Sequence, residues 1–264
     1  MDLIARINQI NDDLNMIFQW AAQNSLVINP QKTQAILFSK NVIDTSDLTI
    51  QVNSTIVDWQ EKVKNLGLYM DKFFKFDFHV NNICQQSYFK LKKIHEYKYI
   101  LPEETKKRLV ESLILSIPNY LDIVYGPFLT EYNQFKIQKI QNSCARYVRC
   151  VPLGDHVSQH VVELFKTNMK QRQLVHMGSM VHQVINTFKP KYLAELIQFR
   201  GDLHDINIRR KNNINIPRHN TEFFKSSFPY QAATLYNSIP ENLKTLSLAC
   251  FKRNFKEFVK NGNP

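Results

Sequence analysis

Apolar residues near the start of the chain recur at intervals of three and four, which predicts an amphipathic helix over residues 3–22. The face expected to be buried comprises Ile4, Ile7, Ile10, Leu14, Ile17, Phe18 and Ala21. After a polar break, apolar runs at 26–28 and 35–38 flank an Asn-Pro-Gln-Lys-Thr segment, and each run predicts a strand. The opening of the chain therefore predicts helix, turn, strand, turn and strand, with Lys32 just before the second strand.

Alternating apolar and polar residues predict antiparallel strands in the next stretch. The alternation runs over 48–52 and resumes at 55–57, so the Asn-Ser pair between them predicts a hairpin turn. Residues 62–69 predict one further strand. Residues 1–70 are thus expected to mix one helix with antiparallel strands, at a size where burial of apolar surface is marginal, and they look like part of something larger.

The hydrophobic period becomes helical from Phe76 onward. Helices are predicted after Phe76, between Pro102 and Pro118, and over 131–149, and the short links between them indicate a small bundle. The first helix has one apolar face, made of Val80, Ile83, Cys84, Ser87, Leu91 and Ile94. The second is expected to bury Leu109, Val110, Leu113, Ile114 and Ile117. The third is expected to bury Phe135, Ile137, Ile140, Cys144 and Val148.

Residues 151–155 form the clearest predicted linker, because Pro and Gly interrupt the helical pattern there. Beyond it the pattern predicts an extended segment at 206–217 and helices at about 157–166, 169–187, just after Pro190, 227–237 and 247–260. The predicted fold class is α+β and predominantly α-helical. Its regions are a small antiparallel part over residues 1–70, a helical bundle over 71–150, and a basic helical C-terminal region over 151–264.

The net charge of +11 is distributed unevenly along the chain. Residues 1–70 carry a net charge of −2, residues 71–150 of +5 and residues 151–264 of +8. A basic excess confined to the later two-thirds favours a surface for a polyanion, with nucleic acid first. A generally basic protein with solvated lysines is the alternative that charge alone leaves open.

Composition indicates a folded intracellular protein, of the nucleus or the cytoplasm. Hydrophobic residues make up 44% of the chain and aromatic residues 12%, more than disordered chains contain. An acidic residue follows Met1 where a secretory signal carries bases, and no apolar run approaches the roughly 20 residues of a membrane span. No membrane partner is therefore expected, and the four cysteines are expected to be reduced thiols.

Two groups of residues look like metal sites but have unsuitable spacing. Asp12 and Asp13 are adjacent, yet on a helix they point in different directions and cannot share metal ions as polymerase aspartates do. The second group follows the order of zinc ligands with intervals that zinc fingers do not use: Cys144, Cys150, His156 and His160. A solvated helix face and ordinary thiols are the favoured interpretations, and the chain is expected to hold no metal or other cofactor.

A basic stripe is predicted on the third helix of the bundle. Its members recur at three and four residues, opposite the apolar face: Lys139, Asn142, Arg146 and Arg149. This spacing suits phosphate contacts along a nucleic-acid backbone. Lys90 and Lys93, with Lys106 and Lys107, are expected to extend the same surface, and Arg209-Arg210-Lys211 is a weaker second candidate. An ordinary solvated helix face is the alternative.

The opening stretch also resembles a known family. The pattern W-A-x-x-N-x-L-x-x-N-P-x-K-T-x-x-I-L-F at 20–38 resembles the segment that follows the catalytic aspartates in reverse transcriptases of non-long-terminal-repeat retrotransposons, of the insect jockey-like type. Further phrases in the family's order extend the resemblance over nearly the whole chain. They lie at 62–67, 101–102, 118–120, 140–146, 155–158, 190–193, 227–228, 237–240 and 247–252.

The resemblance implies a role for each region. Residues 1–70 would be the late palm, 71–150 the thumb and 151–264 the C-terminal region of the polymerase. Lys32 would lie near the incoming nucleotide as an accessory to catalysis, and Leu66 and Gly67 would hold the primer end. Lys139, Arg146 and Arg149 would follow the duplex of RNA template and DNA primer.

The family's catalytic aspartates, which hold Mg²⁺ in the intact enzyme, would lie before Met1. The resemblance therefore implies a fragment of an RNA-directed DNA polymerase that holds template and primer but cannot polymerise alone, with the N-terminal part of the polymerase as a further partner. Two alternatives stay open. One is a non-catalytic nucleic-acid-binding module, and the other is the non-functional product of a decayed element.

Overall fold

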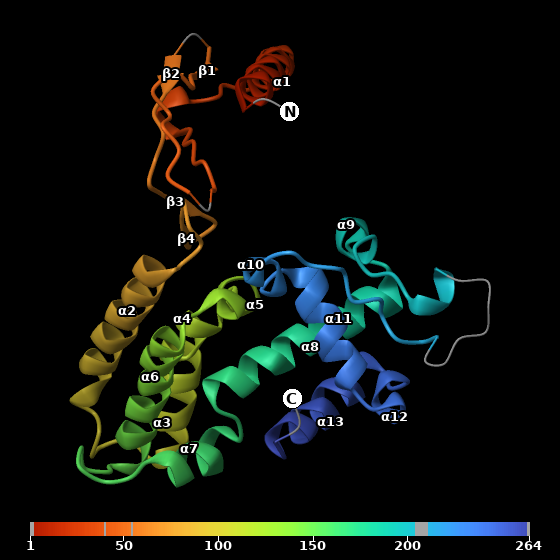
Figure 1. Ribbon diagram of the computed structural model, residues 1–264. Helices are drawn as coiled ribbons and strands as arrows, with labels where there is room; N and C mark the ends of the chain where they lie inside the picture. Colours follow the sequence, from red (N-terminus) through yellow and green to blue (C-terminus); the bar gives the residue numbers. More distant parts are fainter. Residues whose placement is uncertain (1–2, 40, 54, 204–210, 263–264) are drawn as a thin grey trace. The chain divides into compact units, whose positions relative to one another are not determined.

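The computed structural model describes residues 3–39, 41–53, 55–203 and 211–262 (Figure 1). The chain divides into two compact units, Met1–His79 and Val80–Pro264. The predicted fold class is confirmed at a coarse level, because the structure is mostly helical with two small antiparallel strand pairs. The division of the helical part at residue 150 stays a prediction.

The first unit packs one helix against a hairpin. Helix α1 (Leu3–Gln23) lies against β1 (Ile50–Val52), which pairs antiparallel with β2 (Thr55–Val57). Val52 lies opposite Thr55, as the predicted two-residue turn requires. The core of this unit comprises Ile7, Ala35, Leu48, Ile50, Val52 and Val57. Trp59 closes it, since its Nε1 donates a hydrogen bond to the Leu48 carbonyl at 2.6 Å.

Neither strand predicted at 26–28 and 35–38 forms. Between them lies a 3₁₀ turn, η1 (Pro30–Lys32), where the Asn29 side chain accepts a hydrogen bond from the Gln31 N–H at 2.9 Å. An apolar run becomes a strand only where a neighbouring backbone supplies hydrogen-bond partners. In the part of the chain that the structure describes, these two runs form a single bridge, at Ala35.

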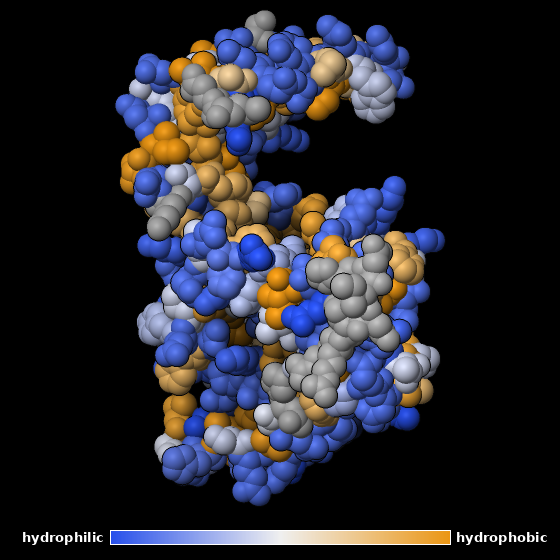
Figure 2. Space-filling model, turned by 45° about the vertical axis from the view of Figure 1, so that its right-hand side comes forward, coloured by the Kyte–Doolittle hydropathy of each residue, from blue (hydrophilic) through white to orange (hydrophobic). Residues whose placement is uncertain are grey.

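The apolar face of α1 is only partly covered. Ile7 and Ala21 are buried as expected, whereas Ile10 and Ile17 are exposed, as is Trp20 on the same flank of the helix. Figure 2 shows hydrophobic residues on the surface of this unit. This flank of α1 is therefore left uncovered by the described part of the chain.

Residues 62–69 form a hairpin rather than the single strand that their alternation predicts. Strand β3 (Lys62–Asn65) pairs antiparallel with β4 (Leu68–Asp71). The chain reverses at Leu66 and Gly67, whose φ angles are +47° and +89°. Two successive positive φ angles are typical of the two-residue turn whose twist matches that of paired strands.

We expect Gly67→Ala to destabilise the first unit by about 1–2 kcal/mol, because alanine at a positive φ angle strains the backbone. Leu66→Asn should stabilise it, because asparagine adopts the left-handed conformation more readily than leucine. Both tryptophans of the chain, Trp20 and Trp59, lie in this unit, so urea unfolding followed by tryptophan fluorescence measures it alone. Shifts of the same sign in the two variants would contradict this turn geometry.

The second unit is built of helices. Its long helices are α2 (Asp77–His95), which begins in the first unit, α6 (Glu131–Arg149), α8 (Met169–Thr187), α11 (Phe228–Ser238) and α13 (Leu248–Lys260). Shorter elements are α3 (Glu103–Leu109), the π turn η2 (Val110–Ile114), α4 (Ser116–Asn119), α5 (Asp122–Tyr125), η3 (Gly126–Phe128), α7 (Ser158–Phe165), α9 (Lys191–Ala194), η4 (Arg200–Asp202), α10 (Glu222–Lys225) and α12 (Glu241–Lys244). The predicted bounds of the helices at 131–149 and 169–187 are confirmed. No helix within the described ranges combines the length and apolar content of a membrane span.

Two residues expected in the helical core lie outside it. The π turn η2 inserts one extra residue, with the Leu115 N–H donating to the Val110 carbonyl at 2.8 Å, so Leu115 is buried and Leu113 is exposed. Phe135 of α6 is exposed as well, whereas Ile137 of the same helix is buried.

The core of the second unit lies where α11 and α13 pack on α8 (Figure 1). Gly178 of α8 allows this approach, since a Cβ atom there would lie 2.2 Å from the Phe255 ring of α13. The His182 ring stacks on Phe251 with centroids 4.0 Å apart, and its Nε2 lies 2.9 Å from the Leu246 carbonyl oxygen. These contacts fix α13 against α8.

Candidate nucleic-acid interface

Three exposed aromatic side chains of the second unit each lie beside a lysine four residues later. The pairs are Phe89 with Lys93, Tyr132 with Lys136, and Phe135 with Lys139. In each pair the ammonium lies 4.4–4.5 Å from the ring centroid, and the rings are 55–66% exposed. These aromatic–lysine pairs are stabilised by cation–π attraction, yet both members remain accessible to a ligand.

The pairs lie on two neighbouring helices. Lys136 Nζ of α6 donates to Asn81 Oδ1 of α2 at 2.9 Å, and the Tyr147 hydroxyl of α6 donates to the Ile94 carbonyl of α2 at 3.0 Å. Exposed rings provide stacking platforms for bases, and nearby lysines contact phosphates. The alternation of the two along one helix layer is therefore suited to a nucleic-acid strand.

The structure places the predicted basic stripe on one face of α6, with different surroundings for its members. Lys139 is exposed and belongs to an aromatic–lysine pair, and Asn142 Oδ1 accepts a hydrogen bond from Gln138 Nε2 at 2.9 Å. The Arg146 guanidinium donates to the carbonyls of Pro152 and Asp155 in the loop after the helix. Arg146 thus holds that loop as well as carrying charge.

Arg149 lies between two carboxylates. Its guanidinium is 3.1 Å from Glu103 and 3.4 Å from Glu163, which come from α3 and α7. Two acidic partners offset its charge, and an incoming phosphate would compete with them. Among the four members of the stripe, Lys139 is therefore the cation most available to nucleic acid.

The other predicted cations divide by exposure. Lys90 and Lys93 are exposed on α2. Lys106 is only 5% exposed, because its Nζ donates to the Lys98 carbonyl at 3.1 Å and to Cys150 Sγ at 3.3 Å, so its expected place on the surface is wrong. Lys211 is exposed in a turn, whereas Arg209 and Arg210 lie outside the described residues.

In the first unit, the residues singled out by the family resemblance are exposed. Lys32 is the last residue of the turn η1, and Leu66 and Gly67 form the tip of the β3–β4 hairpin. Lys64, next to that tip, lies 5.2 Å from the centroid of the Tyr69 ring. Leu66 is thus an exposed leucine with a positive φ angle, a backbone conformation that is strained for this residue.

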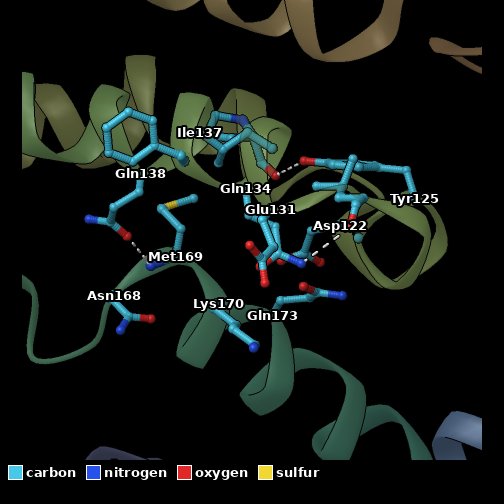
Figure 3. Close-up of a pocket in the computed structure, with 14 residues that line it drawn as sticks. Asp122, Tyr125, Glu131, Gln134, Ile137, Gln138, Asn168, Met169, Lys170 and Gln173 are labelled. Atoms are coloured by element: carbon cyan, nitrogen blue, oxygen red, sulfur yellow. Dashed lines mark hydrogen bonds between the residues drawn. The ribbon is translucent and has the colours of Figure 1, made fainter. Parts of the chain in front are cut away.

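A pocket of about 370 Å³ adjoins Phe135, between α5, α6 and α8 (Figure 3). Its polar lining is rich in amide side chains, contributed by Gln134, Gln138, Asn168 and Gln173. Gly126 makes room for one of them, since a Cβ atom there would lie 2.2 Å from the Gln173 amide nitrogen. Two carboxylates, Asp122 and Glu131, and one cation, Lys170, also belong to the polar lining. Amides offer both donors and acceptors, so the pocket suits an uncharged polar group such as the edge of a base.

One Asp–His pair has the geometry of catalytic dyads, but among the described residues no hydroxyl or thiol is hydrogen-bonded to its imidazole. His176 Nδ1 lies 2.6 Å from Asp122 Oδ2. The nearest hydroxyl along α8, that of Ser179, donates to the Val175 carbonyl at 2.6 Å instead of to the imidazole. Over the described ranges, no group of three or more His, Cys, Asp or Glu side chains is arranged to hold a metal ion. Burial raises the pKa of the Cys144 thiol to about 12.

The sequence pattern does not single out Phe89, Tyr132 and Phe135, because an aromatic residue within a helix is usually assigned to the core. A signal was nevertheless present, since each aromatic residue precedes a lysine by four positions.

Comparison of the chain with protein-family models, with curated proteins and with solved structures finds no match.

Proposed function

We propose that the second unit binds nucleic acid through the aromatic–lysine pairs of α2 and α6. The observation that carries this proposal is the presence of three exposed rings, each with a lysine within cation–π distance, on two neighbouring helices. The charge distribution supports it, because residues 80–264 carry a net charge of +13 and residues 1–79 of −2.

We further propose that the bound nucleic acid is an RNA template paired with a DNA primer. The ordered phrases shared with retrotransposon reverse transcriptases support this identity, with the first unit as a late-palm segment and α2 to α6 as a thumb. In this proposal the chain holds template and primer but does not polymerise alone. The exposed tip of the β3–β4 hairpin, at Leu66 and Gly67, would contact the primer end.

The uncovered flank of α1 supports the further partner of this proposal. Ile10, Ile17 and Trp20 are exposed on one flank of the helix, and among the described residues the apolar run at 35–38 forms a single bridge, at Ala35. A polypeptide segment with additional strands, such as the N-terminal part of a polymerase, would cover both. The same observation supports the alternative of a decayed element, whose product would lack that cover.

Replacement of the three paired lysines is expected to weaken binding of an RNA template annealed to a shorter DNA primer by at least tenfold. Lys93→Gln, Lys136→Gln and Lys139→Gln together remove three phosphate contacts, so the slope of log affinity against log salt should become shallower by about 2–3. Fluorescence anisotropy of a labelled primer, measured over a range of salt concentrations, gives both quantities.

A matched triple variant controls for net charge. Lys166, Lys189 and Lys191 are exposed and belong to no aromatic–lysine pair described here, so their replacement by glutamine changes the charge equally. Binding should fall less in this variant than in the first. Equal losses in the two variants, or an affinity of the unmodified chain that does not depend on salt, would contradict the proposal.

A further inference from the structure

A second pocket, of about 580 Å³, lies between α8 and α13. Helix α13 contributes three cationic side chains to its lining, those of Lys252, Arg253 and Lys256. Helix α8 contributes the polar side chains of His176 and Gln183. Among the described residues that line this pocket there is no carboxylate.

The three cations have no acidic partner in the described part of the chain. The neighbouring pair on α13 shows the contrast, since Lys260 Nζ lies 3.3 Å from Glu257. Lys252, Arg253 and Lys256 form no such ion pair. Three like charges within about one turn of helix repel each other, and a bound anion would remove that repulsion.

The pocket is held by close packing, because the adjacent face of α13 is buried in the core. Phe251, Phe255 and Val259 are buried against α8, and the Gln171 side chain donates to the Val259 carbonyl at 3.3 Å. Gly178 sets the distance between the helices. Cations placed on rigid elements bind a ligand with little loss of conformational freedom.

The carboxylate that contacts His176 is already engaged. Asp122 Oδ2 lies 2.6 Å from His176 Nδ1, so that ring nitrogen is directed away from a ligand and Nε2 is left for one. Arg172, one turn earlier on α8, opposes the charge of Asp122, and its buried Nη1 has no hydrogen-bond partner among the described residues. The cations of the pocket lining are therefore opposed by no carboxylate in that lining.

We propose that the pocket between α8 and α13 is a phosphate-binding site, in which Lys252, Arg253 and Lys256 hold the polyphosphate of a nucleotide or adjacent phosphates of a nucleic-acid strand. Arginine and lysine donors converge there with an amide, as phosphate oxygens require. The volume falls within the range of about 300–1,000 Å³ typical of ligand pockets, which is room for more than one phosphate. This site does not rest on the aromatic–lysine pairs.

Titration calorimetry of the full chain with sodium pyrophosphate tests the site. We expect one binding site per chain, weakened at least tenfold by the double variant Lys252→Gln, Lys256→Gln. Gln183→Glu, which adds a carboxylate to the pocket, should weaken it similarly with the same thermal midpoint by circular dichroism. Lys260→Gln removes a charge from the same helix outside the pocket and should leave the affinity within twofold. Absence of binding, or equal losses at Lys260 and in the pocket, would overturn the proposal.

The source of the phosphate follows from two further titrations. If ATP binds at least tenfold more tightly than pyrophosphate and an RNA–DNA hybrid does not displace it, the ligand is a nucleotide. If the hybrid displaces pyrophosphate and its own affinity falls in Arg253→Gln, the ligand is a nucleic-acid backbone. The Lys93, Lys136 and Lys139 variant should retain pyrophosphate binding, so failure of one proposal is distinguishable from failure of the other.

Discussion

Replacement of Phe255 by alanine is expected to lower the free energy of unfolding of the second unit by about 3–5 kcal/mol. Phe255 is fully buried, stacks on Phe251 with centroids 5.1 Å apart, and covers Gly178. Because Gly178 has no side chain that could move into the space, the truncated residue leaves a cavity between α8 and α13. Urea unfolding followed by the helical circular-dichroism signal measures this loss.

 An unfolding midpoint at the same urea concentration as in the unmodified chain would contradict the role of this ring.

Two controls belong to the same experiment. Tyr192→Ala removes an aromatic ring that is exposed on α9, and we expect it to change stability by about 0.5 kcal/mol or less. Tryptophan fluorescence reports the first unit alone, because Trp20 and Trp59 both lie there. Its transition should stay in place in Phe255→Ala if the two units unfold independently.

Acidification is expected to destabilise the first unit by about 2–3 kcal/mol between pH 7 and pH 4. Burial lowers the pKa of His79 from 6.5 to about 4, and the Tyr69 N–H points at its Nδ1 from 3.5 Å. The unfolded chain takes up a proton on this histidine below about pH 6.5, whereas the folded chain does so only near pH 4. The unfolded state therefore binds more protons in this window, and stability falls as the pH falls.

Urea unfolding at several pH values, followed by tryptophan fluorescence, measures this loss. His79→Gln should be less stable than the unmodified chain at pH 7 but should lose little further stability on acidification. An unchanged pH dependence in this variant would show that another group is responsible. Burial also lowers the pKa of His182, so the second unit, followed by circular dichroism, should show a dependence of the same sign.

The positions of the long helices follow from local sequence. Helix α6 begins and ends at the predicted residues, and the Thr130 side chain caps its start by accepting from the Asn133 N–H. Helix α8 begins with a capping box between Asn168 and Gln171. Helical hydrogen bonds and caps join residues a few positions apart, so a short window of sequence contains the information that places them.

Strand formation depended on more distant residues. The apolar runs at 26–28 and 35–38 have the composition of strands, but a strand requires a partner whose position no local window contains. The hairpin turn at Leu66 and Gly67 is a different case. The glycine signal was present in the sequence, and the alternation of the flanking residues obscured it.

Which cations remain available to a ligand depends on packing between distant segments. The spacing of the basic stripe on α6 is a local property, but Arg149 meets Glu103 and Glu163 from two other helices, and Lys106 is buried against Cys150. The three cations of α13 form a pocket only because Gly178 lets that helix pack closely on α8. A charge is available when no distant carboxylate or carbonyl lies within reach, and that condition is set by packing between segments far apart in the sequence.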